Sequence, residues 1–303
     1  VSGIATVHSG VAVNPAGLPL ERALEVAEAN RSLNELSAID PPEGIPAFLQ
    51  AAQAEVVFEN TPVSYADGEP ALDHLRAALQ LGAHAITANK GPVVHGYREL
   101  TEVARQQGCA FLFEATVMDG APIFSTFREA LPAARLQAVK GILNSTSNLI
   151  LTRMETGERF EDAVAYAQSI GLAERDPSGD VDGWDAAIKL SILATVLMGV
   201  SVKPDEVERQ GIRDITPEMI AEAAAAGERW KLICSAYYEE DGLVARVAPE
   251  RVGADTPFYN VSGSTSIAQF ETDVLGRLSI IGEDPGPDTT AYGLLADMIT
   301  ALT

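Results

Sequence analysis

An acidic loop that leads directly into an apolar helix is the feature of this chain that most restricts its fold. Residues 171–189 read Gly-Leu-Ala-Glu-Arg-Asp-Pro-Ser-Gly-Asp-Val-Asp-Gly-Trp-Asp-Ala-Ala-Ile-Lys. From Trp184 to Met198 apolar residues occupy nearly every position, which predicts a helix that is buried on all sides. The segment therefore has to place a dense group of charges at the border of the protein core.

Asp185 and Lys189 lie four residues apart at the start of this predicted helix. Side chains at that spacing share one helical face and can form an ion pair. An ammonium group at the inner edge of a core helix, held by a carboxylate one turn earlier, is a candidate proton donor. The spacing alone favours the simpler interpretation, which is an ordinary surface ion pair beside a capping loop.

The composition indicates a folded and strongly acidic protein. The chain has 303 residues, enough for about two domains, and its net charge is −22. Such a surface repels nucleic acid and anionic membranes, so we expect neither as a partner. Only five of the 21 basic residues are Lys. This pattern favours adaptation to high salt, and an ordinary acidic cytosolic enzyme is the alternative.

The two cysteines, Cys109 and Cys234, lie in apolar surroundings and form no metal or disulfide pattern. With no signal peptide and no apolar run of the ~18–20 residues that span a bilayer, this predicts a cytoplasmic protein. The chain begins inside a predicted strand at residues 3–7 and contains no Gly-x-Gly-x-x-Gly. We therefore expect the sequence to be a fragment that lacks a phosphate-binding unit.

Strand and helix patterns alternate up to about residue 113. Residues 55–59, 84–87 and 109–113 read as strands, and residues 70–81 and 96–107 read as helices. This alternation predicts a parallel, doubly wound sheet. Beyond residue 114 the pattern favours an antiparallel sheet, with an Asp-Gly turn at Asp241 and Gly242. The predicted strands there are 136–143, 231–238, 243–247 and 274–281, and the predicted helices are 149–154, 161–170, 184–198, 218–226 and 289–302.

Several motifs in this chain resemble those of the homoserine dehydrogenase family, and they occur in the family's order. They are Thr-Ala-Asn-Lys-Gly-Pro at 87–92, Phe-Glu-Ala-Thr-Val at 113–117, Gly-Ile-Leu-Asn-Ser-Thr-Ser-Asn at 141–148, and the acidic segment 171–189. The resemblance covers essentially the whole chain. It implies an α/β protein with a Rossmann-like doubly wound parallel sheet, incomplete at the N-terminus, and a central α+β domain. The implied boundaries are 1–115 with 272–303 for dinucleotide binding, and 116–271 for substrate binding and dimerisation.

The resemblance also implies an activity. A family member interconverts L-aspartate 4-semialdehyde and L-homoserine by hydride transfer with NAD or NADP, in the biosynthesis of threonine and methionine. Lys189 would be the general acid, because a positioned ammonium offsets the negative charge on the aldehyde oxygen and supplies the proton. Asp185 would hold Lys189, and Lys90, which we expect where a strand runs into a loop, would assist proton transfer.

The small amino-acid substrate would be held by acidic and polar side chains. By resemblance, Glu174 and Asp180 would bind its α-ammonium group, since carboxylates are natural receptors for such a cation. Calcium binding or plain solvation is the alternative for these two residues. Thr146 would contact the substrate, and capping of a helix at 149–154 is an alternative role that is compatible with this contact.

The implied cofactor site comprises Thr61, Asn89, Lys90 and Gly282. The stretch that begins at Glu114 resembles the family's monovalent-cation loop, in which Glu114 and the carbonyl group of Val117 would bind Na⁺ or K⁺. A buried Glu114 that pairs locally explains that stretch equally well. The resemblance further implies a homodimer.

The chain departs from the family at four places. Val7-His8-Ser9 stands where the family often has an acid that binds ribose, Leu172 replaces a Tyr, and Ser145 replaces a Gly. The turn at 282–286, Gly-Glu-Asp-Pro-Gly, places carboxylates where cofactor phosphates should approach. Two alternatives to a homoserine dehydrogenase follow. One is a non-catalytic dimeric binding protein with an impaired cofactor site, and the other is a dehydrogenase of a different small amino-acid aldehyde.

Overall fold

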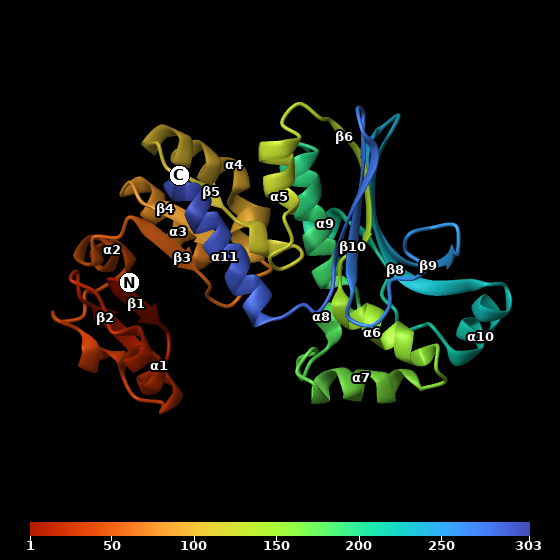
Figure 1. Ribbon diagram of the computed structural model, residues 1–303, viewed down its shortest axis with the longest axis horizontal. Coiled ribbons are helices and arrows are strands. Elements are labelled where there is room, and N and C mark those ends of the chain that lie inside the picture. Colours follow the sequence, from red (N-terminus) through yellow and green to blue (C-terminus); the bar gives the residue numbers. More distant parts are fainter. The chain divides into compact units, whose positions relative to one another are not determined.

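Three separate β-sheets organise the computed structural model, which describes residues 1–303 (Figure 1). The chain divides into two compact units, residues 1–113 with 296–303, and residues 114–295. The first boundary lies close to the expected one, but residues 272–295 group with the second unit. The reason is that strand β11 (Gly276–Gly282) pairs with β10 (Ser266–Thr272), which in turn pairs with a strand of the second unit.

A parallel sheet forms the centre of the first unit. Its order is β3 (Val56–Glu59), β4 (His84–Thr87) and β5 (Phe111–Leu112), which confirms the predicted parallel arrangement. Helices α3 (Ala71–Gln80) and α4 (Lys90–Gln107) pack against each other and against this sheet (Figure 1). Helix α2 (Ile45–Ala52) packs against α3. The carboxyl ends of these strands are where parallel sheets bind ligands.

The predicted N-terminal strand exists but lies outside the parallel sheet. Strand β1 (Gly3–Thr6) pairs antiparallel with β2 (Gly10–Val13) in a two-stranded sheet of its own. Only three residues connect the two strands, and so short a connection can join antiparallel neighbours but not parallel ones. Helix α1 (Leu20–Glu28) and the 3₁₀ helix η1 (Leu33–Leu36) follow.

Helix α4 begins at Lys90, six residues earlier than the pattern predicts, so the prediction that Lys90 lies in a loop is wrong. The side chain of Asn89 caps the helix by accepting a hydrogen bond from the N–H of Gly91 at 3.0 Å. Pro92 is tolerated in the first turn because the N–H that it lacks has no partner there. Gly91 and Pro92 therefore lie inside the helix, where the sequence pattern suggested a break.

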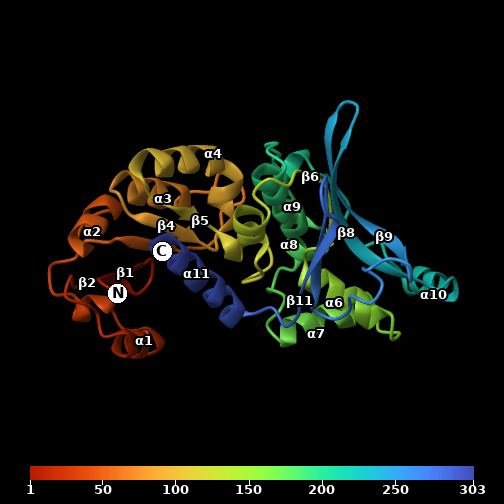
Figure 2. The same cartoon turned by 45° about the horizontal axis from the view of Figure 1, so that its top comes forward.

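A six-stranded sheet forms the second unit, in the order β11, β10, β6, β8, β9, β7. Neighbours are antiparallel, except that β7 (Glu208–Arg209) runs parallel to β9 (Gly242–Gly253). Strands β6 (Leu136–Ile142) and β8 (Glu228–Glu239) were predicted, although β8 and β9 are longer than expected. Glu240 and Asp241 form the turn that joins β8 to β9, one residue earlier than the predicted turn at Asp241 and Gly242, and Gly242 is the first residue of β9. This hairpin tip projects past the other strands in Figure 2.

Helix α9 (Trp184–Leu197) is the predicted core helix, and most of its residues are buried. It packs against β8 and β9, while α6 (Ser145–Met154) packs against β8 and against α7 (Phe160–Ser169) (Figure 1). The remaining helices are α5 (Ile123–Ser125), α8 (Ser178–Val181), α10 (Pro217–Ala225) and α11 (Pro287–Leu302), with the short η2 (Glu114–Thr116), η3 (Thr126–Ala130) and η4 (Pro204–Glu206). None of the helices has the length and apolar character needed to span a bilayer.

A buried polar cluster joins α6 to β8. The ammonium group of Lys231 is fully buried and donates to Oδ1 of Asn148 at 3.2 Å, and Oε1 of Glu155 lies 3.7 Å from it. The amide nitrogen of Asn148 donates to the carbonyl groups of Gly263 and Thr265, each at 3.1 Å. The cluster thereby ties the loop before β10 to α6.

Candidate active site

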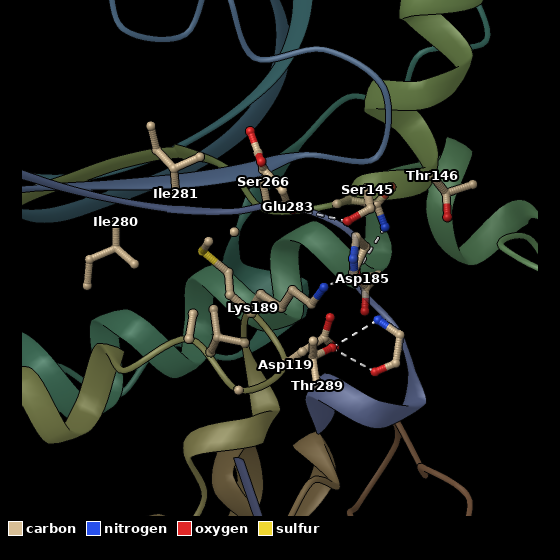
Figure 3. Close-up of a pocket in the computed structure, with 18 of the residues that line it drawn as sticks. Asp119, Ser145, Thr146, Asp185, Lys189, Ser266, Ile280, Ile281, Glu283 and Thr289 are labelled. Atoms are coloured by element: carbon tan, nitrogen blue, oxygen red, sulfur yellow. Dashed lines mark hydrogen bonds and ion pairs between the residues drawn. The ribbon is translucent and has the colours of Figure 1, made fainter. Parts of the chain in front are cut away.

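A cavity of about 620 Å³ lies in the second unit. Its lining comes from the loop 117–122, the start of α6, the acidic segment with the first turns of α9, the start of β10, and the connection from β11 to α11. Figure 3 shows Asp185 and Lys189 of α9 facing Thr289 and Asp119 across this space. The acidic segment before α9 and the first turns of α9 therefore both line this cavity.

Lys189 and Asp185 form the predicted ion pair. Nζ of Lys189 lies 3.0 Å from Oδ2 of Asp185, and it donates a hydrogen bond to the carbonyl oxygen of Leu143 at 2.9 Å. The side chains are only 17% and 14% exposed, so the interpretation as an ordinary surface ion pair is wrong. An ammonium has three N–H donors, and these two bonds fix its position while leaving a donor for a ligand.

Asp180 is the second carboxylate at this end of the cavity. Nδ2 of Asn144 bridges the two acids, since it donates to Oδ1 of Asp180 at 2.7 Å and to Oδ2 of Asp185 at 3.0 Å. Burial raises the pKa of Asp180, the hydrogen bond from Asn144 opposes that rise, and the charge of Asp185 adds to it. A cation that arrives beside Asp180 would therefore meet a poorly hydrated carboxylate, which strengthens their attraction.

Thr146 also lines the cavity, in the first turn of α6. Its hydroxyl group donates to the carbonyl oxygen of Leu172 at 3.2 Å. The cap of this helix is Asn144, whose Oδ1 accepts from the N–H of Ser147 at 2.8 Å, so the capping role considered for Thr146 falls to Asn144. Asn144 was not among the predicted site residues, although an Asn directly before a helix is a recognisable N-cap signal.

Glu174 is not brought into the cavity. Its side chain is exposed, and its carbonyl oxygen accepts a hydrogen bond from Nε2 of Gln168 at 3.0 Å. Of the two carboxylates predicted to bind an ammonium group, only Asp180 contributes to the cavity wall. A role for Glu174 in substrate binding stays a prediction.

Glu114 has local backbone partners, as one of the two interpretations predicted. Its two carboxylate oxygens accept hydrogen bonds from the N–H groups of Phe124 and Ser125, both at 2.7 Å. The carboxylate thereby caps the start of α5, while Val117 lines the cavity. The chain contains no group of three or more His, Cys, Asp or Glu side chains arranged to hold a metal ion. A monovalent-cation site at Glu114 stays a prediction.

In the first unit, three predicted cofactor residues meet at the carboxyl ends of β3 and β4. Nδ2 of Asn89 donates to the carbonyl oxygen of Thr61 at 2.9 Å, and Lys90 is the first residue of α4. Glu59 was not predicted as a site residue. It is 3% exposed and accepts hydrogen bonds from both the N–H and the hydroxyl group of Thr61. Nδ1 of His74 lies 3.5 Å from the same carboxylate. The two strand ends are thus locked together through side chains.

Gly282 and the acidic turn that follows it belong to the cavity wall of the second unit. Glu283, Asp288 and Asp119 add three carboxylates to the lining. The hydroxyl group of Thr289 donates to the carbonyl oxygen of Gly286 at 2.8 Å and accepts from its N–H at 3.0 Å, which fixes the turn at the start of α11. The cavity thus holds Lys189 as its one basic side chain.

These features define a class of protein: an α/β enzyme with a parallel sheet suited to a ligand at its strand ends and a separate unit that carries a lysine–carboxylate pair. The comparisons with known proteins are more specific. The family model described as homoserine dehydrogenase matches residues 122–299. The chain belongs to the homoserine dehydrogenase family.

Individual relatives agree with this assignment. The chain is 37% identical to a homoserine dehydrogenase of Methanocaldococcus jannaschii, over 97% of this chain and 86% of the relative. It is 33% identical to an NAD⁺-dependent homoserine dehydrogenase of Pseudomonas canavaninivorans, over 99% of this chain and 85% of the relative. A hyperthermophilic archaeal homoserine dehydrogenase solved in complex with NADPH matches the whole chain and 88% of its own length, with a TM-score of 0.82 and 29% identity.

Proposed function

We propose that this protein interconverts L-aspartate 4-semialdehyde and L-homoserine by hydride transfer with NAD or NADP, and that Lys189 is the proton donor. The observation that carries the proposal is the position of Lys189. Its ammonium group is held between Asp185 and the carbonyl oxygen of Leu143 at the wall of a cavity that also contains Asp180. Membership of the homoserine dehydrogenase family supports the choice of substrate.

Lys189 would act in both directions of the reaction, as the acid in aldehyde reduction and as the base in alcohol oxidation. NAD or NADP would supply the hydride that adds to the aldehyde carbon, so that negative charge would develop on the aldehyde oxygen. The ammonium of Lys189 stabilises that charge and transfers one proton to the oxygen, which gives the primary alcohol and leaves a neutral amine. In the oxidative direction the neutral amine takes the proton of the alcohol. Asp185 keeps the side chain in place.

The amino-acid part of the substrate requires its own partners. Asp180 provides a carboxylate for the α-ammonium group, and such a charge-assisted bond is stronger than a neutral one. Thr146 supplies a hydroxyl group to the same cavity, and Glu174 remains a second candidate for the ammonium group. Asp180, at the cavity wall, would orient the substrate so that its aldehyde oxygen reaches Lys189.

The residues at the ends of β3 and β4 fit a dinucleotide. Glu59, Thr61 and Asn89 form a fixed edge, and Lys90 places a positive charge at the start of α4, where an anionic group is also favoured by the helix dipole. In the second unit Gly282 lines the cavity without a side chain of its own. These residues would hold parts of NAD or NADP.

The family relationship supports four further parts of the proposal. The protein would work as a homodimer in the cytoplasm, in the biosynthesis of threonine and methionine. Glu114 and the carbonyl group of Val117 would bind Na⁺ or K⁺, since each carboxylate oxygen of Glu114 accepts one N–H and keeps a further lone pair.

Homoserine-dependent reduction of NAD⁺ and of NADP⁺ by the purified protein tests the proposal, at low and at high KCl. We expect reduction with at least one cofactor, and loss of turnover when Lys189 is replaced. If homoserine binds but neither cofactor is reduced, the protein is instead a non-catalytic binding protein. If another small amino alcohol is oxidised faster than homoserine, the substrate assignment is wrong.

A further inference from the structure

Asn144 is a buried side chain whose two ends serve different elements. It is 4% exposed, and its Oδ1 accepts the N–H of Ser147 as the cap of α6. Because that end of the amide accepts a hydrogen bond, the other end must be the NH₂ group. This fixes the orientation of the amide without appeal to the carboxylates, and it directs both N–H bonds of Nδ2 away from the helix.

Those two N–H bonds go to carboxylates on two other elements. One is donated to Asp180 of α8 and the other to Asp185 of α9. Two carboxylates that share one donor nitrogen lie close together, and their mutual repulsion opposes ionisation of both. Lys189 approaches only Asp185 as an ion-pair partner. Asn144 is therefore the neutral group that holds the two acids in one arrangement.

We infer that Asn144 is a positioning residue of the proposed reaction, which holds Asp185 against Lys189 and maintains Asp180 as the anionic receptor for the substrate's α-ammonium group. The inference rests on the proposed function. It assigns the two carboxylates different tasks, although they lie on neighbouring helices and share a donor. Asp185 serves the proton donor, and Asp180 serves the substrate.

The charges that face Asp180 set the direction of the effect. Asp185 and Lys189 of α9 act on it with opposite signs, Asn144 donates a hydrogen bond to it, and the nearby hydroxyl group of Thr146 has a smaller effect that also lowers its pKa. The hydrogen bond from Asn144 lowers the pKa of Asp180, against the effect of burial. Loss of that bond would raise the pKa further. Asp180 would then lose its charge, and its hold on an ammonium group, at a higher pH than in the wild type.

The substitution Asn144→Ser separates this role from helix capping. Serine caps helices about as well as asparagine, so the N-terminus of α6 keeps its acceptor. The shorter side chain carries no NH₂ group and cannot bridge the two acids. Asn144→Ala is the matched comparison, because it removes the cap and the bridge together. A role limited to helix capping predicts that only the alanine variant is affected.

The experiment measures kcat/KM for homoserine against pH, together with the thermal midpoint and the KM of the cofactor. For Asn144→Ser we expect the acid limb to move up by about one pH unit, and kcat/KM on that limb to fall about tenfold. The cofactor KM should stay near wild type, and the thermal midpoint should fall by less than in Asn144→Ala, which also loses the helix cap. For Asn144→Ala we expect the same shift of the limb together with a lower midpoint. An unchanged acid limb in Asn144→Ser would overturn the inference.

Direct titration of homoserine across the same pH range separates this inference from the proposed function. If the wild type binds homoserine without oxidising it, the proposed reaction fails, and the pH dependence of binding still tests Asn144. If the wild type is active and the serine variant keeps the wild-type pH profile, only the inference on Asn144 fails. If the wild type neither binds nor oxidises homoserine, both are overturned.

Discussion

Lys189 has two fixed acceptors and lies at the wall of an acidic cavity. Its replacement removes the proposed proton donor and also the ion-pair partner of Asp185. We expect Lys189→Ala to lower kcat by about 10²–10⁴-fold, the usual contribution of general acid–base catalysis. The KM of homoserine should change less, because the ammonium group acts mainly in the transition state. Steady-state kinetics measure both quantities.

Lys203→Ala is the matched control for this prediction, because Lys203 is exposed and does not line the cavity. It should retain the activity of the wild type. Turnover of Lys189→Ala within a factor of about three of the wild type would remove Lys189 from the mechanism.

Asp180 combines a role in binding with a cost to folding. Burial raises its pKa above the value in the unfolded chain, so the folded state holds the proton more tightly. The free energy of unfolding therefore falls as the pH rises from the pKa of the unfolded chain through the higher pKa of the folded state. At neutral pH the charge of Asp180 opposes folding. We expect Asp180→Asn to raise the thermal midpoint at pH 7 while it increases the KM of homoserine at least tenfold.

Asp176→Asn is the control, because the pKa of Asp176 is shifted in the opposite direction to that of Asp180. Hydrogen bonds from Ser178 lower the pKa of Asp176, so its charge supports the native state. This variant should not raise the midpoint and should leave the KM of homoserine unchanged. A lower midpoint for Asp180→Asn would contradict the argument.

At this scale the sequence predicted some residues well and others poorly. The pairing of Asp185 with Lys189 could be predicted because helical periodicity fixes which side chains meet. No periodicity governs the loop that contains Glu174, so its exposure was not foreseeable from spacing. Asn144 was missed because a capping preference identifies the acceptor end of an amide but says nothing of where its donor end points.

Strand β8 contains a buried ionisable side chain, Lys231, whose titration affects stability. Burial lowers the pKa of Lys231 from 10.5 to about 8, although Glu155 partly opposes the shift. Between these values the unfolded chain binds the proton and the folded chain does not. The free energy of unfolding should therefore rise with pH from about 8 to about 10.5, by on the order of 2–3 kcal/mol from this group.

The double variant Lys231→Met, Glu155→Gln is the reference for that measurement. Removing Lys231 alone would leave Glu155 without its buried partner, and Oε1 of Glu155 already lacks a hydrogen bond. Chemical denaturation across the pH series should show the stability of the wild type rising relative to the double variant. Parallel curves for the two proteins would show that Lys231 does not titrate in this range.

Elements were predicted best where apolar periodicity was strong. Helix α9 follows the expected range to within one residue, because a helix with nearly every position apolar leaves little ambiguity. The start of α4 was missed because Gly91 and Pro92 are helix breakers in most positions, and only the cap at Asn89 makes them acceptable. The antiparallel pairing of β1 was missed because a single strand pattern does not identify its neighbour.

Net charge acts on the whole molecule. The chain carries −22 at pH 7, and repulsion between these charges opposes the compact state. The Debye length falls from ~10 Å at 0.1 M salt to ~3 Å at 1 M, so added salt screens most of this repulsion. We expect the thermal midpoint to rise across a KCl series.

A parallel series with sucrose controls for general solute effects, because sucrose stabilises by exclusion from the surface without screening charge. The midpoint should rise more steeply in KCl than in sucrose. A flat or falling midpoint in KCl would contradict an adaptation of this surface to salt.

The cavity wall has a consequence for how the protein should be assayed. Five carboxylates line the cavity, Asp119, Asp180, Asp185, Glu283 and Asp288, and they face one lysine. Such a site should also attract small organic cations from solution. Primary-amine buffers should therefore compete with the substrate, and their inhibition should weaken as the carboxylates are protonated or salt is added. Apparent affinities measured in amine buffers and in zwitterionic buffers would then differ for a reason that lies in the protein itself.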